Sequence, residues 1–146
     1  MAYRSYLSGR TFNNVHFAGH LDQNTLAAYI RNSLAFVLPS LTEGLGRVAI
    51  EAHLLEKPVI ASRVGGIPEV VSDGSSGLLF EPGDEAALSL ALIKLLNSPG
   101  LADSMGMAGK KAVVEKFNYQ TYFQSYYNMV KGICRNEVNY KQRGDL

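Results

Sequence analysis

The stretch L-A-F-V-L-P-S-L-T-E-G-L-G-R-V-A-I-E-A, residues 34–52, decides how this chain folds. Its first part, 34–38, is continuously apolar and is followed by a proline, which is typical of a strand buried on both faces. Two glycines then introduce a helix that we expect over about 46–56. The stretch therefore predicts a strand, a loop and a helix, with Glu43 in the loop and Glu51 in the helix.

The composition is that of one ordinary globular domain. The 146 residues are 47% hydrophobic and 18% charged, with a net charge of +1. No basic cluster is interleaved with aromatic residues, so a nucleic-acid partner is not expected. A single cysteine, Cys134, excludes an intramolecular disulfide and a cysteine-based zinc site. Because no apolar run is long enough for a membrane span and no signal-peptide segment is present, we expect a cytoplasmic protein.

The rest of the chain alternates short apolar runs with amphipathic stretches. Such alternation indicates a parallel sheet covered by helices on both faces, so the predicted fold class is α/β, a Rossmann-like doubly wound parallel sheet. We expect one domain over 15–136, with a lead-in at 1–14 and a tail at 137–146. Strands are predicted at 15–19, 34–38, 59–62 and 78–80. Helices are predicted at 22–32, 46–56, 84–97, 100–117 and 119–136, with Asp22 and Asp84 as N-caps, and a short helix or turn is predicted at 65–71.

The loop and helix after the second strand have the chemistry of a sugar and phosphate site. Ligands of doubly wound sheets bind where strands end and helices begin. Gly44 and Gly46 allow close approach to the backbone, and the start of the next helix favours a phosphate. Glu43 is placed to accept hydrogen bonds from sugar hydroxyls. If the helix were continuous, the Glu51 side chain would lie about 80° around the helix axis from Glu43. There its carboxylate could accept hydrogen bonds from a ribose diol.

Less specific interpretations of these residues remain open on the sequence alone. Acidic residues near helix N-termini are common because they stabilise the helix dipole. Arg47 and Glu51 are four residues apart and could form a surface ion pair. Two other functions also remain: a glycoside hydrolase that uses Glu43 and Glu51 as its carboxylates, and a non-catalytic nucleotide-sugar binding module.

Three ordered motifs carry a resemblance to a known family. They are P-S-L-T-E-G-L-G-R-V-A-I-E-A (39–52), P-V-I-A-S-R-V-G-G-I-P-E-V-V (58–71) and D-G-S-S-G-L-L-F-E-P-G-D (73–84). They resemble the C-terminal, nucleotide-sugar-binding domain of retaining glycosyltransferases of the GT-B class, family four. The likeness covers about 15–127. It implies a truncated second domain of such an enzyme, which takes part in polysaccharide or glycolipid assembly.

The resemblance implies a role for each matching residue. Glu43, the expected catalytic residue, and Glu51 match a pair of glutamates in the family. Glu43 would hold hydroxyls of the transferred sugar, and Glu51 would hold the ribose. The backbone at Gly44, Leu45 and Gly46 would contact the sugar and the diphosphate.

The remaining donor-site assignments come from the same resemblance. Ser40 ends the strand that delivers the loop. Gly19 and His20 would lie near the base, and Gly65 and Gly66 would border the donor cleft. The implied reaction moves a hexosyl group from a nucleotide-diphosphate sugar to a glycan or glycolipid acceptor with retention. No cofactor and no metal are expected.

The chain also departs from the family's pattern. Leu45 stands where the family often has Phe, Leu34 where an Asp is frequent, and Glu56 where a helix-ending Gly is usual. If that last position needs a left-handed backbone, Glu56 introduces strain. Earlier strand–helix units with an Arg/Lys diphosphate clamp, and an N-terminal acceptor-binding domain, are expected in a larger parent enzyme. The isolated chain is therefore expected to be inactive in transfer, and any peripheral membrane contact would belong to the parent.

The last predicted helix carries an apolar stripe. Tyr122, Phe123 and Tyr126 recur with other apolar residues at three- and four-residue steps over 119–134, so we expect self-association through this helix. His16, His20 and His53 have no metal-ligand spacing and are expected to be solvent-facing or satisfied by hydrogen bonds.

Overall fold

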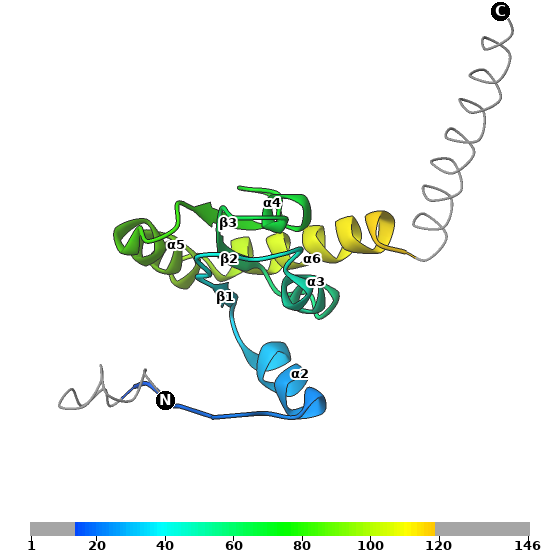
Figure 1. The fold of residues 1–146 in the computed structure, drawn as a ribbon, viewed down its shortest axis with the longest axis horizontal. Helices are drawn as coiled ribbons and strands as arrows, with labels where there is room; N and C mark the ends of the chain where they lie inside the picture. Colours follow the sequence, from blue (N-terminus) through cyan, green and yellow to red (C-terminus); the bar gives the residue numbers. More distant parts are fainter. Residues whose placement is uncertain (1–13, 119–146) are drawn as a thin grey trace, which may run out of the picture.

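Three short parallel strands lie at the centre of the computed structural model, which describes residues 14–118 (Figure 1). The sheet order follows the chain, with β2 between β1 and β3. Both pairings, β1 with β2 and β2 with β3, are parallel. In register, Phe36 pairs with Val59, and Val59 pairs with Gly77. The strands are β1 (Phe36–Leu38), β2 (Val59–Ser62) and β3 (Gly77–Phe80).

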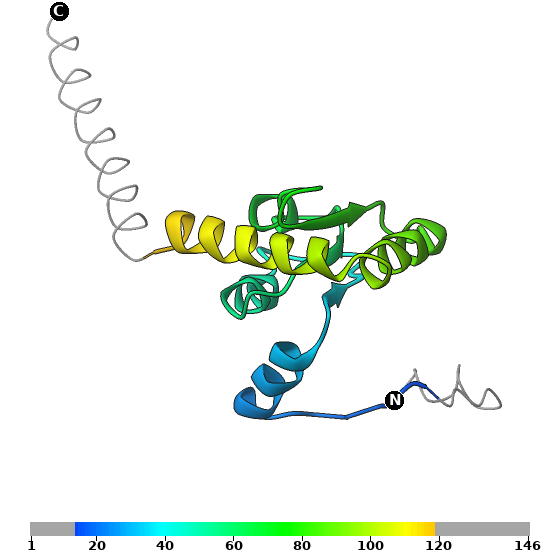
Figure 2. The same cartoon turned by 180° about the vertical axis from the view of Figure 1, so that it is seen from behind.

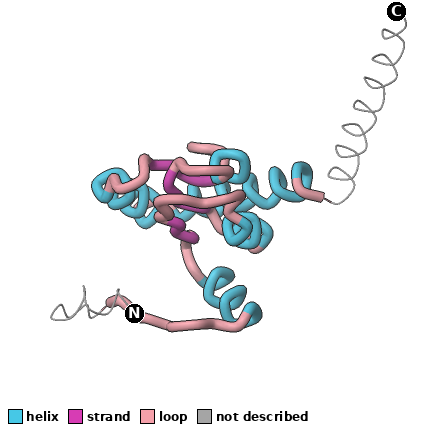
Figure 3. Tube along the Cα trace, in the orientation of Figure 1, coloured by secondary structure: helices cyan, strands magenta, loops and turns pink. Residues whose placement is uncertain are grey.

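Five helices of the described part surround this sheet (Figure 3). Each of the predicted helices between residues 22 and 117 is present, with ends that differ from the prediction by a few residues. The helices are α2 (Gln23–Asn32), α3 (Arg47–Leu54), α4 (Ile67–Val70), α5 (Glu85–Leu96) and α6 (Pro99–Lys116). The predicted helix 119–136 and Cys134 lie outside the described residues. Within residues 14–118, no helix is both long and apolar enough to cross a bilayer.

Both faces of the sheet are covered, which confirms the α/β, doubly wound prediction. All four residues of β2 are buried, and its side chains alternate between two cores. Val59 and Ala61 pack in a core with α2, α3 and α4, whereas Ile60 packs in a second core with α5. The helix α6 contributes to both cores, and Figure 2 shows it (yellow) crossing the whole domain.

The predicted N-caps form as expected. The Asp22 carboxylate accepts hydrogen bonds from the Thr25 N–H at 3.0 Å and the Thr25 hydroxyl at 2.6 Å. These bonds hold the pKa of Asp22 below its ordinary value. The Asp84 carboxylate accepts the Ala87 N–H at 2.8 Å. Two carboxylates thus fix where α2 and α5 begin.

The predicted strand at 15–19 is wrong. The segment forms no strand in the structure, and every one of its residues is exposed, including Val15 and Phe17. An extended segment becomes a strand only when a neighbour takes its backbone hydrogen bonds, and no described strand lies beside this one. The apolar residues of α2 at three- and four-residue steps are not equally covered: Ile30 and Leu26 pack in the core, whereas Tyr29 is 52% exposed.

Glu56 occupies a left-handed backbone conformation. Its φ is 60°, and it is the one non-glycine residue with a positive φ among residues 14–118. The chain leaves α3 here, with the Lys57 N–H donating to the Ala52 carbonyl and the Glu56 N–H to the His53 carbonyl. The strain that we expected for a non-glycine residue at this position is therefore present. An exposed ion pair of 2.8 Å joins Glu56 to Lys110.

Glycine at position 56 should stabilise the chain, because it adopts this conformation without strain. The comparison is cleanest in a Lys110→Ala background, where the ion pair cannot contribute. There Glu56→Gly should raise the melting temperature by about 3–6 °C. Glu56→Ala in the same background is the control and should give no such gain. Equal melting temperatures for the two variants in a thermal scan would contradict the strain.

His53 is a buried histidine between α3 and α6. Its Nδ1 lies 3.1 Å from the Lys57 carbonyl, which can only accept, so Nδ1–H donates. Its Nε2 is buried without a hydrogen-bond partner, so the expectation of a satisfied or solvent-facing residue is only half right. A Cβ at Gly109 would lie 2.2 Å from Nδ1, so α6 needs a glycine there. Burial lowers the pKa of the imidazole below 6.5, and the hydrogen bond to Lys57 opposes this only in part.

The His53 pKa makes the stability of the fold sensitive to acid. Because the folded protein binds this proton at lower pH than the unfolded chain, the free energy of unfolding should decline as the pH falls below 6.5. His53→Phe should remove that part of the decline, whereas His16→Gln, at an exposed position, should keep it. Urea denaturation at a series of pH values measures the effect. A decline as steep in His53→Phe as in the wild type would refute the assignment.

Candidate functional site

The predicted site lies where β1 and β2 end. Residues 39–46 connect β1 to α3, and residues 63–66 connect β2 to α4. Because both strands are parallel, these two loops leave the sheet at the same edge (Figure 1). This edge is where ligands of doubly wound sheets bind.

Gly46 begins α3 in a conformation that only glycine adopts readily. Its φ is 75°, and a Cβ there would lie 3.3 Å from a side-chain carbon of Ile67. The Gly46 carbonyl accepts the first helical hydrogen bond, from Ala49 at 2.8 Å. No side chain caps this end of α3. The N–H groups of Arg47 and Val48 are therefore available to an anion.

Gly65 and Gly66 pack against the backbone of the loop after β1. The Gly66 N–H donates to the Gly44 carbonyl at 2.6 Å. Gly65 has a φ of 52°, and a Cβ there would lie 1.8 Å from the Glu43 carbonyl oxygen. A Cβ at Gly66 would lie 2.8 Å from the Gly44 oxygen. The two glycines thus bring the two loops into direct contact, and no side chain could fit between them.

Ser62 is a positioning residue that sequence reasoning missed. It ends β2, is buried, and donates its hydroxyl hydrogen bond to the Ser40 carbonyl, with the Leu38 carbonyl 3.3 Å away. Ser40, a predicted site residue, therefore contributes its backbone rather than its side chain to this contact. The available signal was a hydroxyl residue at the end of the otherwise apolar run V-I-A-S. Such a residue can hold the end of a neighbouring strand.

The two glutamates have different surroundings. The Glu43 carboxylate accepts a hydrogen bond from the N–H of the next residue, Gly44, at 3.0 Å. The Glu51 carboxylate has no hydrogen-bond or ion-pair partner among residues 14–118. The surface pair of Arg47 with Glu51 that the sequence left open therefore does not form. Glu51 is a half-buried acceptor without a partner.

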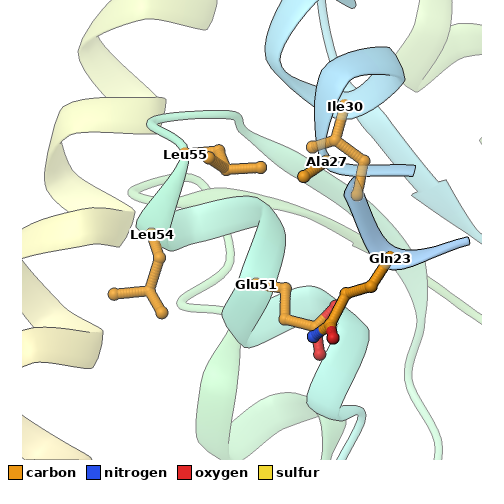
Figure 4. Close-up of a pocket in the computed structure, with 6 residues that line it drawn as sticks. All are labelled: Gln23, Ala27, Ile30, Glu51, Leu54 and Leu55. Atoms are coloured by element: carbon orange, nitrogen blue, oxygen red, sulfur yellow. The ribbon is translucent and has the colours of Figure 1, made fainter. Parts of the chain in front are cut away.

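Glu51 lines a pocket between α2 and α3 (Figure 4). The pocket has a volume of about 200 Å³. Its wall is aliphatic except for two polar side chains, Glu51 and Gln23, both labelled in Figure 4. Glu43 is not among its lining residues. The other lining residues are Ala27, Ile30, Leu54 and Leu55.

The structure brings together some of the predicted donor-site residues and not others. Glu43, Gly44, Leu45 and Gly46 form one loop, which contacts the pair 65–66. Gly19 and His20 are exposed and precede α2, and no hydrogen bond or ion pair in the described part of the chain joins them to that loop. Their predicted position near a base stays a prediction.

An ion-pair network holds the neighbouring loops at the same edge. Arg63, directly after β2, pairs with Asp73 at 2.7 Å and with Glu81 at 3.4 Å. The Asp73 carboxylate also accepts the Leu79 N–H at 2.9 Å. This hydrogen bond and the Arg63 guanidinium hold the pKa of Asp73 below its ordinary value. Arg63 is therefore already engaged within the protein.

Comparison with known proteins assigns the family. The model of the family described as "Glycosyl transferases group 1" matches residues 9–112. The chain belongs to this family. The expected GT-B resemblance, family four, is thereby confirmed, since the group 1 model is of that type.

Individual group 1 relatives agree with the assignment. A glycogen synthase of Mycobacterium tuberculosis is 35% identical over 112 residues, which are 77% of this chain and 27% of that protein. The solved sucrose-phosphate synthase of Thermosynechococcus elongatus superposes with a TM-score of 0.75 at 32% identity, covering 92% of this chain and 33% of the other. Anabaena HepE, solved in complex with UDP, shares the fold with a TM-score of 0.73 at 24% identity, over 90% of this chain and 35% of its own. The chain thus spans about a third or less of the length of each of these proteins.

The contact of Gly65 with the Glu43 backbone should be sensitive to a single methyl group. Gly65→Ala should lower the free energy of unfolding by about 1–3 kcal/mol and shift the amide signals of residues 43–46, because the loops must separate. Gly74→Ala is the matched control, since Gly74 also has a positive φ but a Cβ there would have no neighbour within 4 Å. Gly74→Ala should lower the free energy of unfolding only by the strain of the left-handed backbone, about 1 kcal/mol. The same loss for both variants in urea denaturation, with unshifted amide signals, would argue against the contact.

Proposed function

We propose that this chain is the donor-binding part of a glycosyltransferase that moves a hexosyl group from a nucleotide-diphosphate sugar to a glycan or glycolipid acceptor with retention. The observation that carries the proposal is the loop Glu43–Gly46. It lies at the carboxyl ends of parallel strands, is held by Gly65 and Gly66, and leads into the uncapped start of α3. Membership of the glycosyl transferases group 1 family supports the reaction class.

The site supplies a distinct group for each part of such a donor. The N–H groups at the start of α3 would bind the diphosphate, with Gly44 and Gly46 allowing close approach. Glu43 would accept hydrogen bonds from hydroxyls of the transferred sugar, and Glu51 from the ribose. A carboxylate accepts two hydroxyl hydrogen bonds well, since its oxygens offer about four lone-pair sites.

The leaving group of the reaction would be the nucleoside diphosphate. Its negative charge grows as the bond to the sugar breaks, and preorganised N–H groups at a helix start stabilise such charge without reorganisation. Glu43 would hold the sugar so that its anomeric carbon faces the acceptor. HepE has been solved in complex with UDP and with UDP-glucose. This supports a nucleotide sugar as the donor here.

A hydrolase is less well supported. Carboxylate pairs of glycosidases flank one scissile bond, about 5–9.5 Å apart. Here the Glu43 carboxylate is hydrogen-bonded within its own loop, and membership of the glycosyl transferases group 1 family supports transfer rather than hydrolysis. A non-catalytic nucleotide-sugar binding module is the second candidate, because the groups at this site are suited to hold a donor. Release of free sugar from a glycoside without any nucleotide would favour the hydrolase.

Glu51→Ala should weaken nucleotide binding. Titration calorimetry of the 146-residue chain with uridine, adenosine and guanosine diphosphates should detect weak binding of at least one of them. Glu51→Ala should raise its dissociation constant about tenfold or more, because the hydrogen bonds lost are to a charged acceptor. Glu85→Ala, which removes an exposed carboxylate from the first turn of α5, is the control. If no nucleoside diphosphate binds the wild type, the proposed function fails.

A further inference from the structure

The polar part of the pocket between α2 and α3 consists of two side chains of different chemistry. Glu51 provides a carboxylate that can only accept, and Gln23 provides an amide that can both donate and accept. Both side chains line the same, otherwise aliphatic pocket (Figure 4). Neither makes a hydrogen bond to another described residue. In this structure both are therefore free to bind a ligand.

The position of Gln23 is set by the cap of α2. Asp22 accepts two hydrogen bonds from Thr25, so Gln23 is held as the first residue of the helix. The buried Ile30, two turns further along α2, packs in the same core as Ala52, the neighbour of Glu51 on α3. The cap and the core together fix the first turn of α2 relative to Glu51. Gln23 thus reaches the pocket from a rigid element.

We infer that Gln23 is the second polar arm of the ribose subsite and makes this site selective for ribonucleotides over deoxyribonucleotides. The inference rests on the proposed function. A sugar hydroxyl donates one hydrogen bond and accepts up to two. Glu51 can take the donated hydrogen, and the Gln23 amide N–H can donate to the same oxygen. The pair therefore satisfies a hydroxyl more fully than a carboxylate alone.

The size and wall of the pocket agree with this ligand. Pockets that enclose a drug-sized ligand have volumes of about 300–1,000 Å³. The 200 Å³ here suits one part of a nucleotide, such as a ribose, rather than the whole. Ala27, Ile30, Leu54 and Leu55 offer only apolar contact, so a hydroxyl must find its partners at Gln23 and Glu51. A deoxyribose would leave the amide and the carboxylate of this pair without their partner.

Binding of ribonucleoside and deoxyribonucleoside diphosphates tests the inference. The 146-residue chain is titrated with uridine, adenosine and guanosine diphosphates and with their 2′-deoxy and 3′-deoxy forms. The wild type should prefer the ribose form over at least one deoxy form by about tenfold. Gln23→Ala should reduce that preference to about threefold or less. Gln23→Glu, which keeps the size but lacks the N–H donor, should do the same.

Asn24→Ala is the matched control. Asn24 is the next residue on α2 and does not line the pocket, so its removal should leave the preference unchanged. Circular dichroism verifies that each variant is folded. An unchanged preference in both Gln23 variants, with weakened binding in Glu51→Ala, would overturn this inference and leave the proposed function intact. Absence of any nucleotide binding to the wild type would overturn both.

Discussion

The loop after β1 is held in place by backbone contact with the loop after β2. At this contact the Gly66 N–H donates to the Gly44 carbonyl, and Gly65 passes so close to the Glu43 carbonyl that no side chain fits. The contact fixes the path of the chain from the end of β1 to Gly46. Because Gly46 begins α3, it also fixes where the first turn of α3 points. Ser62 adds a hydroxyl hydrogen bond to the Ser40 carbonyl at the same edge.

The same contact separates the roles of the two glutamates. Glu43 belongs to the loop, whereas Glu51 belongs to α3 and lines the pocket with α2. The sugar part of a donor would therefore be positioned by loop-to-loop contact. Its nucleoside part would be positioned by the packing of α2 on α3, which depends on Ile30 and Ala52 in the core. The site thus rests on two structural supports that share α3.

Most of the fold could be predicted from local sequence patterns. Apolar runs bounded by glycine and proline gave the three strands, and carboxylates before amphipathic stretches gave the starts of α2 and α5. The failure at 15–19 has a different cause: an apolar run shows that a segment can be a strand, but pairing depends on a neighbour that local sequence does not specify. The exposure of Tyr29 has the same origin, since a helical stripe does not say how much of it a partner covers.

The candidate site was predictable in its residue types but not in its contacts. The spacing of Glu43 and Glu51 and the glycines between them were visible in the sequence. That Gly65 meets the backbone of Glu43, that Ser62 reaches Ser40, and that Gln23 shares a pocket with Glu51 are contacts between residues 22 or more positions apart. Such contacts are created by the fold and leave no periodic pattern in the sequence.

The close packing of α6 has a consequence for how the domain comes apart. A Cβ at Gly106 would lie 2.0 Å from the Glu56 carbonyl oxygen, and Gly109 leaves room for the His53 ring, so α6 lies directly on the end of α3. Its Met105 belongs to one core and its Val113 to the other. Neither face of the sheet can lose its cover without disturbing a helix that serves both. We therefore expect the domain to unfold as one cooperative unit, and loosening α6 at either end should lower the protection of the β2 amides against hydrogen exchange.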